Sequence, residues 1–261
     1  MTGQTIDLGG TTALVTGAGS GIGAATAAEL ARAGGRVVLA GRRAGRLEQV
    51  RERIAAENGA ADGGTAFALP WDIGRGDDAE DLVAAAAALA GDDVSVLVHA
   101  AGNQVRKPAT DMTLDDWDSV TGLHLRAAFA LSRAVARPLI AAGRPGAVLY
   151  VGSLTSARAG LAGTVAYGAA KSGLLGLMRT LAVEWAVHGI RVNTVAVGFV
   201  ATEMTRDIDG TPARQALVSR APLGRPGTPQ DIARAVAFLS SDYASFITGE
   251  CVTVDGGWSV A

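Results

Sequence analysis

The chain reads TALVTGAGSGIG from Thr12 to Gly23. Its first five residues are apolar or β-branched, which predicts a short buried strand. The glycine-rich turn from Gly17 leads into an alanine-rich run, Ala24 to Ala33, that predicts a helix. Free backbone N–H groups and the helix dipole favour negative charge at such a turn. The stretch therefore predicts an α/β fold whose first turn binds a pyrophosphate.

Segments that predict strands and helices alternate along the rest of the chain. Strands are expected at Arg36–Ala40, Thr65–Leu69, Val94–Ala100, Ala147–Val151, Ile190–Val197 and Glu250–Val254, and helices at Arg43–Glu57, Asp77–Leu89, Leu114–Ala142 and Val165–His188. Alternating units predict a single domain, residues 1–261, with a doubly wound, seven-stranded parallel sheet and helices on both faces. The least regular stretch, 199–228, is expected to form a mobile lid over a substrate.

Composition excludes several classes of function. The 261 residues carry a formal net charge of −2, which gives no sign of a nucleic-acid surface. No apolar stretch reaches the ~20 residues of a membrane span, and the first ten residues lack a signal pattern. Cys251 is the single cysteine, so we expect no internal disulfide and no metal site. These features predict a cytoplasmic protein that acts on a small molecule, without a nucleic-acid or membrane partner.

Three side chains suggest proton transfer. Tyr167 and Lys171 are four residues apart in a predicted helix, so they share one face, and Ser153 follows a predicted strand. A phenol beside an ammonium ionises more easily than a free phenol, whose pKa is about 10. A serine hydroxyl can hold a carbonyl or alcohol oxygen against that phenol. The set suits interconversion of an alcohol and a ketone; the alternative is a helix-surface pair.

At this point the sequence resembles the short-chain dehydrogenase/reductase family, over nearly its whole length. The resemblance is carried by Thr16-Gly17-x-x-x-Gly21-Ile22-Gly23, Asp72, Ser153, Tyr167-x-x-x-Lys171, Val192-Asn193, Gly198 with Thr202, and Val254-Asp255-Gly256-Gly257. It implies a Rossmann-type fold. The runs Arg106–Pro108 and Gly152–Ser156 are similar to the gluconate 5-dehydrogenase and deoxygluconate dehydrogenase branch, which suggests a polar hydroxy acid or polyol as substrate.

The resemblance also implies roles for individual residues. Tyr167 would be the acid/base, Ser153 would orient the substrate oxygen, and Lys171 would lower the pKa of Tyr167 and hold the nicotinamide ribose. Asp72 would contact the adenine, although a loop cap is the alternative. The full set expected to bind the cofactor is Gly17, Gly19, Ser20, Gly21, Ile22, Gly23, Arg42, Arg43, Asp72, Ile73, Ala101, Gly102, Tyr167, Lys171, Gly198, Val200 and Thr202.

The end of the second predicted strand indicates the cofactor. An acidic residue there would bind the ribose hydroxyls of NAD, but this chain has Gly41 followed by Arg42 and Arg43. Two guanidiniums without a carboxylate favour a 2′-phosphate. We therefore expect NADP(H) to be favoured over NAD(H). Against this, both arginines could merely be solvated, and Ser20 stands where many NADP-using relatives carry a basic residue.

Two histidines depart from the family pattern. His99-Ala100-Ala101-Gly102 replaces the usual Asn-Asn-Ala-Gly, and His124 replaces an asparagine that holds a proton-relay water. An imidazole can hold a water or shuttle protons near neutral pH. His124 is therefore a candidate catalytic residue, with plain packing as an equal alternative. Val197 also replaces a proline before Gly198, which leaves that turn less rigid.

Four residues are candidates for substrate contact: Arg106, Lys107, Thr155 and Arg158. The first two could clamp a carboxylate, although each charge could simply be a solvated loop residue. The two long helices form the dimer contact in similar enzymes, so a homo-oligomer, dimer or tetramer, is expected, with a monomer as the alternative. Two other functions stay open: a ketoreductase of an acyl or specialised-metabolite substrate, and a cofactor-binding sensor or non-redox enzyme.

Overall fold

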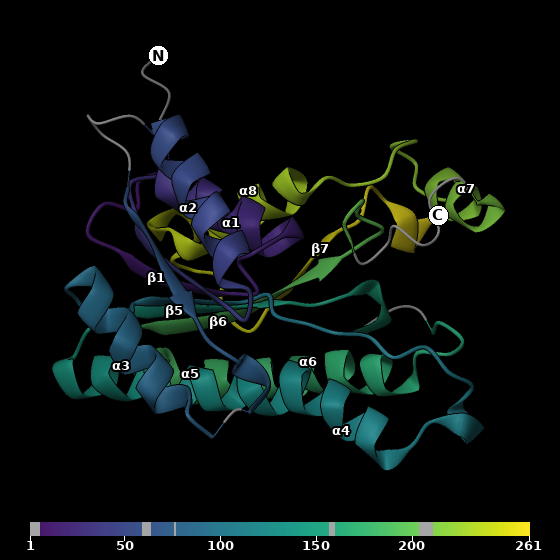
Figure 1. Ribbon diagram of the computed structural model, residues 1–261, viewed down its shortest axis with the longest axis horizontal. Coiled ribbons are helices and arrows are strands. Elements are labelled where there is room, and N and C mark those ends of the chain that lie inside the picture. The colour runs from purple at the N-terminus through teal and green to yellow at the C-terminus, as the bar shows by residue number, and fades with distance from the viewer. Residues whose placement is uncertain (1–5, 59–63, 76, 157–159, 204–210) are drawn as a thin grey trace.

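All seven predicted strands are present, in one parallel sheet. The computed structural model describes residues 6–58, 64–75, 77–156, 160–203 and 211–261 (Figure 1). The strands are β1 Thr12–Thr16, β2 Arg36–Gly41, β3 Ala66–Pro70, β4 Val96–His99, β5 Gly146–Val151, β6 Ile190–Val197 and β7 Cys251–Val254. Their order is β3-β2-β1-β4-β5-β6-β7, which confirms the doubly wound fold. The order in which strands are added to the sheet reverses between β1 and β4, and such folds bind ligands at this point.

Helices cover both faces of the sheet (Figure 1). One layer contains α1 Gly21–Arg32, α2 Ala44–Asn58 and α8 Pro229–Ser240; the other contains α3 Ala79–Ala90, α4 Leu114–Thr121, α5 Ala127–Ala142 and α6 Val165–Trp185. Successive strand residues point to opposite faces, so Leu14 and Leu97 join the core under α5 while Val15 and Val98 join the core under α1. The sheet is thus buried on both faces, as its apolar strands require.

The long helix expected at Leu114–Ala142 has a break in its hydrogen-bond pattern. A π turn, Gly122–Arg126, separates α4 from α5, and the Ala127 N–H donates to the carbonyl oxygen of Gly122, five residues earlier. A π turn adds a residue to the helix and is frequent at functional sites. It places His124 in the irregular part of the helix.

Helix α8 was not predicted from the sequence. Helix α8 begins after Thr228, whose hydroxyl accepts from the Asp231 N–H while the Asp231 carboxylate accepts from the Thr228 N–H. This reciprocal cap and Pro229 in the first turn are both helix-start signals that the sequence contains. The sequence therefore contains the local signals that start this helix.

The stretch expected to be irregular, 199–228, is partly regular. It contains helix α7, Pro212–Ser219, while residues 204–210 lie outside the described part. Its function as a lid stays a prediction. Element ends elsewhere differ by a few residues: β4 starts at Val96 rather than Val94, and α6 ends at Trp185 before a single 3₁₀ turn. Among the helices described, none is both long enough and apolar enough to cross a bilayer.

Candidate active site

One cavity of about 720 Å³ lies at the carboxyl ends of the central strands. Its wall contains every residue that the sequence analysis assigned to catalysis or to the cofactor. These are Gly17, Gly19, Ser20, Gly21, Ile22, Gly23, Arg42, Arg43, Asp72, Ile73, Ala101, Gly102, His124, Ser153, Tyr167, Lys171, Gly198, Val200 and Thr202. The structure therefore brings the glycine turn and the Ser/Tyr/Lys set to one space.

The glycine turn is shaped for close backbone approach. Gly17 has a φ of +68°, and a Cβ there would lie 2.8 Å from the Cα of Ala101. A Cβ on Gly23 would lie 2.3 Å from the Gly17 carbonyl oxygen, so neither position accepts a side chain. Helix α1 begins without a side-chain cap, which leaves its first N–H groups for a ligand. These residues fit a pyrophosphate.

Lys171 is buried beside Tyr167. Its Nζ donates to the carbonyl oxygen of Val151 at 2.5 Å and lies 5.7 Å from the centroid of the Tyr167 ring. Burial disfavours the charged amine and lowers the pKa of Lys171 to about 7. An amine with that pKa can both hold and release a proton near neutral pH.

The pKa of Tyr167 does not follow the expectation. Burial of the phenol raises its pKa, while a hydrogen bond with Ser153 and the positive charge of Arg106 act in the opposite direction. Burial outweighs both, so the pKa of this phenol lies above that of a free tyrosine. The role expected for Lys171 in lowering that pKa stays a prediction.

His99 links three elements at the floor of the site. A carbonyl can only accept, so the 3.0 Å contact with the Leu123 oxygen places the proton on His99 Nε2. Burial lowers the pKa of His99 to about 4, so the ring is neutral and Nδ1 accepts from the Thr16 hydroxyl at 3.0 Å. The Thr16 oxygen in turn accepts from the backbone N–H groups of Ala100 and Ala101. His99 thereby connects β1, the loop after β4 and the π turn.

His124 packs against the phenol ring of Tyr167. Its ring lies edge-on to Tyr167 with centroids 5.2 Å apart, and a Cβ on Gly102 would lie 2.6 Å from its Cε1. The shorter of its contacts with the Asn103 backbone is 2.8 Å, from Nε2–H to the carbonyl oxygen. Nδ1 is buried and has no hydrogen-bond partner among the described residues. Burial lowers the pKa of His124 to about 2, so the ring does not gain a proton near neutral pH.

A carboxylate stands at the far end of the cavity. Glu203 lies 3.8 Å from Arg43 and 3.5 Å from Arg46, and Arg43 also donates to the Ser20 hydroxyl at 3.3 Å. Sequence reasoning found no acidic group near the arginines, because Glu203 is 160 positions away along the chain and no local pattern connects them. On the same side, Asp72 accepts from the Gly74 N–H at 3.2 Å, the loop cap considered as its alternative.

Three of the four substrate candidates, Arg106, Lys107 and Thr155, do not line this cavity. Arg106 is exposed and donates to Gln104, although its charge reaches Tyr167. Lys107 is paired with Asp116 at 2.5 Å, next to the cap of α4, which gives it a structural partner. The Thr155 N–H donates to the Ser153 hydroxyl oxygen at 3.3 Å. Arg158 lies outside the described residues.

Sequence reasoning missed a polar group at the mouth of the cavity. Asn103, Asp118 and Ser119 all line it, and the Asn103 amide donates to the Ser119 carbonyl and hydroxyl oxygens. The Asn103 side-chain oxygen is buried and finds no hydrogen-bond partner in the described part of the chain. Asn103 belongs to no motif in the sequence, and Asp118 and Ser119 follow the predicted helix start without a distinct motif.

Comparisons with known proteins agree with this geometry. A family model described as enoyl-(acyl carrier protein) reductase matches residues 17–259. The L-rhamnose 1-dehydrogenase (NAD(P)(+)) of Azotobacter vinelandii is 41% identical over 94% of this chain and 95% of its own. The gluconate 5-dehydrogenase of Gluconobacter oxydans is 37% identical, over 97% and 96%. A crystal structure from Agrobacterium tumefaciens, described as a 2-deoxy-d-gluconate 3-dehydrogenase with bound NADP, has a TM-score of 0.89 and 39% identity, and covers 98% of this chain and 99% of that one.

Proposed function

Because the chain belongs to the short-chain dehydrogenase/reductase family and is an alcohol/ketone oxidoreductase, we propose that it acts on a sugar, polyol or sugar acid and favours NADP(H) over NAD(H). The observation that carries the proposal is that Ser153, Tyr167 and Lys171 line the same cavity as the glycine turn. The relatives named above act on sugars or sugar acids, which supports this class of substrate.

Each half of the cavity has residues suited to one part of the cofactor. The backbone from Gly17 to Gly23 would hold the pyrophosphate, and Arg42 and Arg43 would hold a 2′-phosphate. Asp72 and Ile73 would contact the adenine. The remaining cofactor residues, Ala101, Gly102, Gly198, Val200 and Thr202, would border the nicotinamide half together with Tyr167 and Lys171.

The protein's own side chains carry the proton. A nicotinamide cofactor supplies or accepts the hydride when bound. Ser153 donates a hydrogen bond to the substrate oxygen, and Tyr167 gives its proton to that oxygen in reduction and takes it in oxidation. Lys171, with a pKa of about 7, then exchanges the proton with Tyr167. General acid/base catalysis of this kind contributes about 10²–10⁴-fold to the rate.

The mouth of the cavity suits a substrate with several hydroxyl groups. Buried polar atoms almost always have a partner in native complexes, and the Asn103 side-chain oxygen is an acceptor without one among the described residues. Asp118 and Ser119 add further acceptors beside it. Arg106, whose charge is felt at Tyr167, is placed to attract a substrate carboxylate. An acyl substrate would leave the Asn103 side-chain oxygen without a partner among the described residues.

His124 has a positioning function in this proposal. Its pKa of about 2 favours a neutral ring near neutral pH and thus packing over the shuttle considered from the sequence. Its free Nδ1 can accept from a water or a ligand, and its edge fixes the orientation of the Tyr167 ring.

Exposed apolar side chains support the expected homo-oligomer. Phe129 on α5 is 44% exposed, Val183 near the end of α6 is 79% exposed, and Val187 in the 3₁₀ turn after α6 is 80% exposed. We propose that α5 and α6 of two copies pack together in a dimer or tetramer, which light scattering would measure. The cytoplasmic location stays a prediction.

A spectrophotometric screen tests the function. Purified protein is mixed with NADP⁺ or NAD⁺ and a panel of sugars, polyols and sugar acids, and in the reverse direction with reduced cofactor and 3-oxoacyl thioesters. We expect reduced nicotinamide to form with members of the sugar panel, at higher catalytic efficiency with NADP⁺. Turnover of the acyl thioesters alone would transfer the assignment to the ketoreductase alternative, and a clear preference for NAD⁺ would contradict the cofactor assignment.

A further inference from the structure

The cofactor cavity has a smaller neighbour on the side of the arginines. This second cavity has a volume of about 320 Å³ and shares Gly19, Ser20, Gly21 and Glu203 with the first. Arg42 and Arg43 line the large cavity, whereas Arg46 and Arg53 line the small one. Glu203 is thus an acidic residue in the wall between two groups of arginines.

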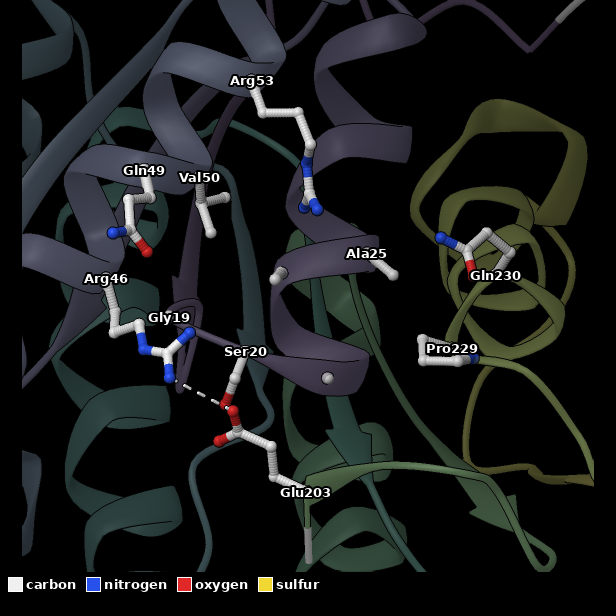
Figure 2. A pocket seen from close by; sticks show the side chains of 12 residues that line it. Gly19, Ser20, Ala25, Arg46, Gln49, Val50, Arg53, Glu203, Pro229 and Gln230 are labelled. Atoms are coloured by element: carbon white, nitrogen blue, oxygen red, sulfur yellow. Dashed lines mark ion pairs between the residues drawn. The ribbon is translucent and has the colours of Figure 1, made fainter. Parts of the chain in front are cut away.

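Figure 2 shows how the side chains meet at this wall. Arg46 comes down from α2 and Glu203 comes up from the segment after β6, and the two point toward one another beside Ser20. The Glu203 carboxylate also faces Arg43, through its other oxygen. One carboxylate is therefore the counter-ion of two guanidiniums that belong to the same helix start.

Both ion pairs are loose. Their N···O distances are 3.8 Å for Arg43 and 3.5 Å for Arg46, longer than the 2.7–2.9 Å of charge-assisted hydrogen bonds. The side chains are 57% exposed for Arg43, 50% for Arg46 and 38% for Glu203, so water and salt weaken their attraction. A dianion that hydrogen-bonds the same guanidiniums would replace this contact readily.

The position of the contact determines which anion competes. In a doubly wound sheet the end of β2 contacts the adenosine ribose, and Arg42 and Arg43 follow β2 directly. We propose that Glu203 sets the cofactor preference. Its carboxylate is the counter-ion of Arg43 and Arg46, and the 2′-phosphate of NADP(H) must displace it on binding. Glu203 therefore weakens the binding of NADP(H) relative to that of NAD(H). This inference rests on the proposed nicotinamide cofactor.

Calorimetric titration of the full chain tests it. Dissociation constants for NADP⁺ and NAD⁺ are measured for the unmodified protein and for Glu203→Gln, which keeps the shape and removes the charge. Loss of this one carboxylate, and with it of two exposed ion pairs, should tighten NADP⁺ binding by about 3- to 10-fold, while NAD⁺ binding changes less than about 2-fold. The gain should shrink at about 0.5 M salt, because screening weakens exposed pairs.

Glu48→Gln is the matched control. It removes the same charge from α2, but Glu48 pairs with Arg51, and neither residue lines either cavity. We expect it to leave both dissociation constants unchanged. The fragments 2′,5′-ADP and 5′-AMP separate electrostatics from folding: the gain in Glu203→Gln should appear with 2′,5′-ADP and be absent with 5′-AMP. An equal change with both fragments would indicate a general structural effect and overturn the proposal.

Failure of the inference differs from failure of the proposed function. If neither dinucleotide binds the unmodified protein, the cofactor assignment is lost. If both bind but their ratio is the same in Glu203→Gln, the assignment stands and the role of Glu203 is refuted.

Discussion

Mild acid should destabilise this protein through its two buried histidines. Burial lowers the pKa of His99 to about 4 and of His124 to about 2, against 6.5 for a free imidazole. Below about pH 6.5 the unfolded chain therefore binds more protons than the folded protein, and the free energy of unfolding falls as the pH falls. Well above pH 6.5 both rings are neutral in both states, and the contribution of the histidines to the pH dependence disappears.

The size of the effect follows from the same shifts. Between pH 6.5 and 5 each histidine should remove about 1.5 kcal/mol from the free energy of unfolding, and the pair about 3 kcal/mol. Total stabilities are about 5–15 kcal/mol, so the loss is large. Few other groups titrate in this window, since free carboxylates titrate near pH 4. Lys171 changes the free energy of unfolding with pH mainly above pH 7, because its pKa is about 7 in the folded protein and 10.5 when free.

Urea unfolding at a series of pH values and one protein concentration measures the effect. His99→Asn, which introduces the residue that the family usually has there, should halve the loss between pH 6.5 and 5. His188→Asn is the matched control, since His188 is the third histidine and is exposed. A free energy of unfolding that stays flat over this window would refute the reasoning. So would an NMR titration in which His99 protonates near pH 6.5 in the folded protein.

Three further outcomes are expected. Tyr167→Phe should reduce turnover by at least about 10²-fold while the dissociation constant of the cofactor, measured by calorimetry, stays nearly unchanged; near-normal turnover would remove Tyr167 as the acid. Gly102→Ala should cost about 1–3 kcal/mol in urea unfolding because its Cβ meets His124, and the cost should vanish in a His124→Ala background; equal costs in both backgrounds would disprove the contact. Thr228→Ala should cost about 1 kcal/mol through loss of the α8 cap, and an unchanged urea midpoint would contradict that estimate.

Motifs with a local mechanism were predictable from the sequence. The glycine turn could be predicted because a strand, four glycines and a helix start are adjacent in the chain. Alternating apolar segments then give the sheet and its helices. Ser153 and the Tyr167–Lys171 pair were found because a strand end and a four-residue helical spacing place them in space.

Contacts between distant segments were not predictable. Glu203 meets Arg43 and Arg46 only through the fold, so the arginines looked free of acidic partners. The shift in the pKa of Tyr167 depends on how deeply the phenol is buried, which no spacing reveals. Lys107 looked like a substrate contact because its partner, Asp116, belongs to the cap of the next helix.

The π turn also has a consequence for how this site can vary. Each residue advances a helix by about 100°, so the additional residue at Gly122–Arg126 offsets the angular phase of α4 from that of α5. Removing one residue there would restore a uniform helix and rotate His124 away from the phenol, whereas point substitutions leave the offset intact. Single-residue insertions and deletions, more than replacements, therefore decide which side chain this helix presents to Tyr167.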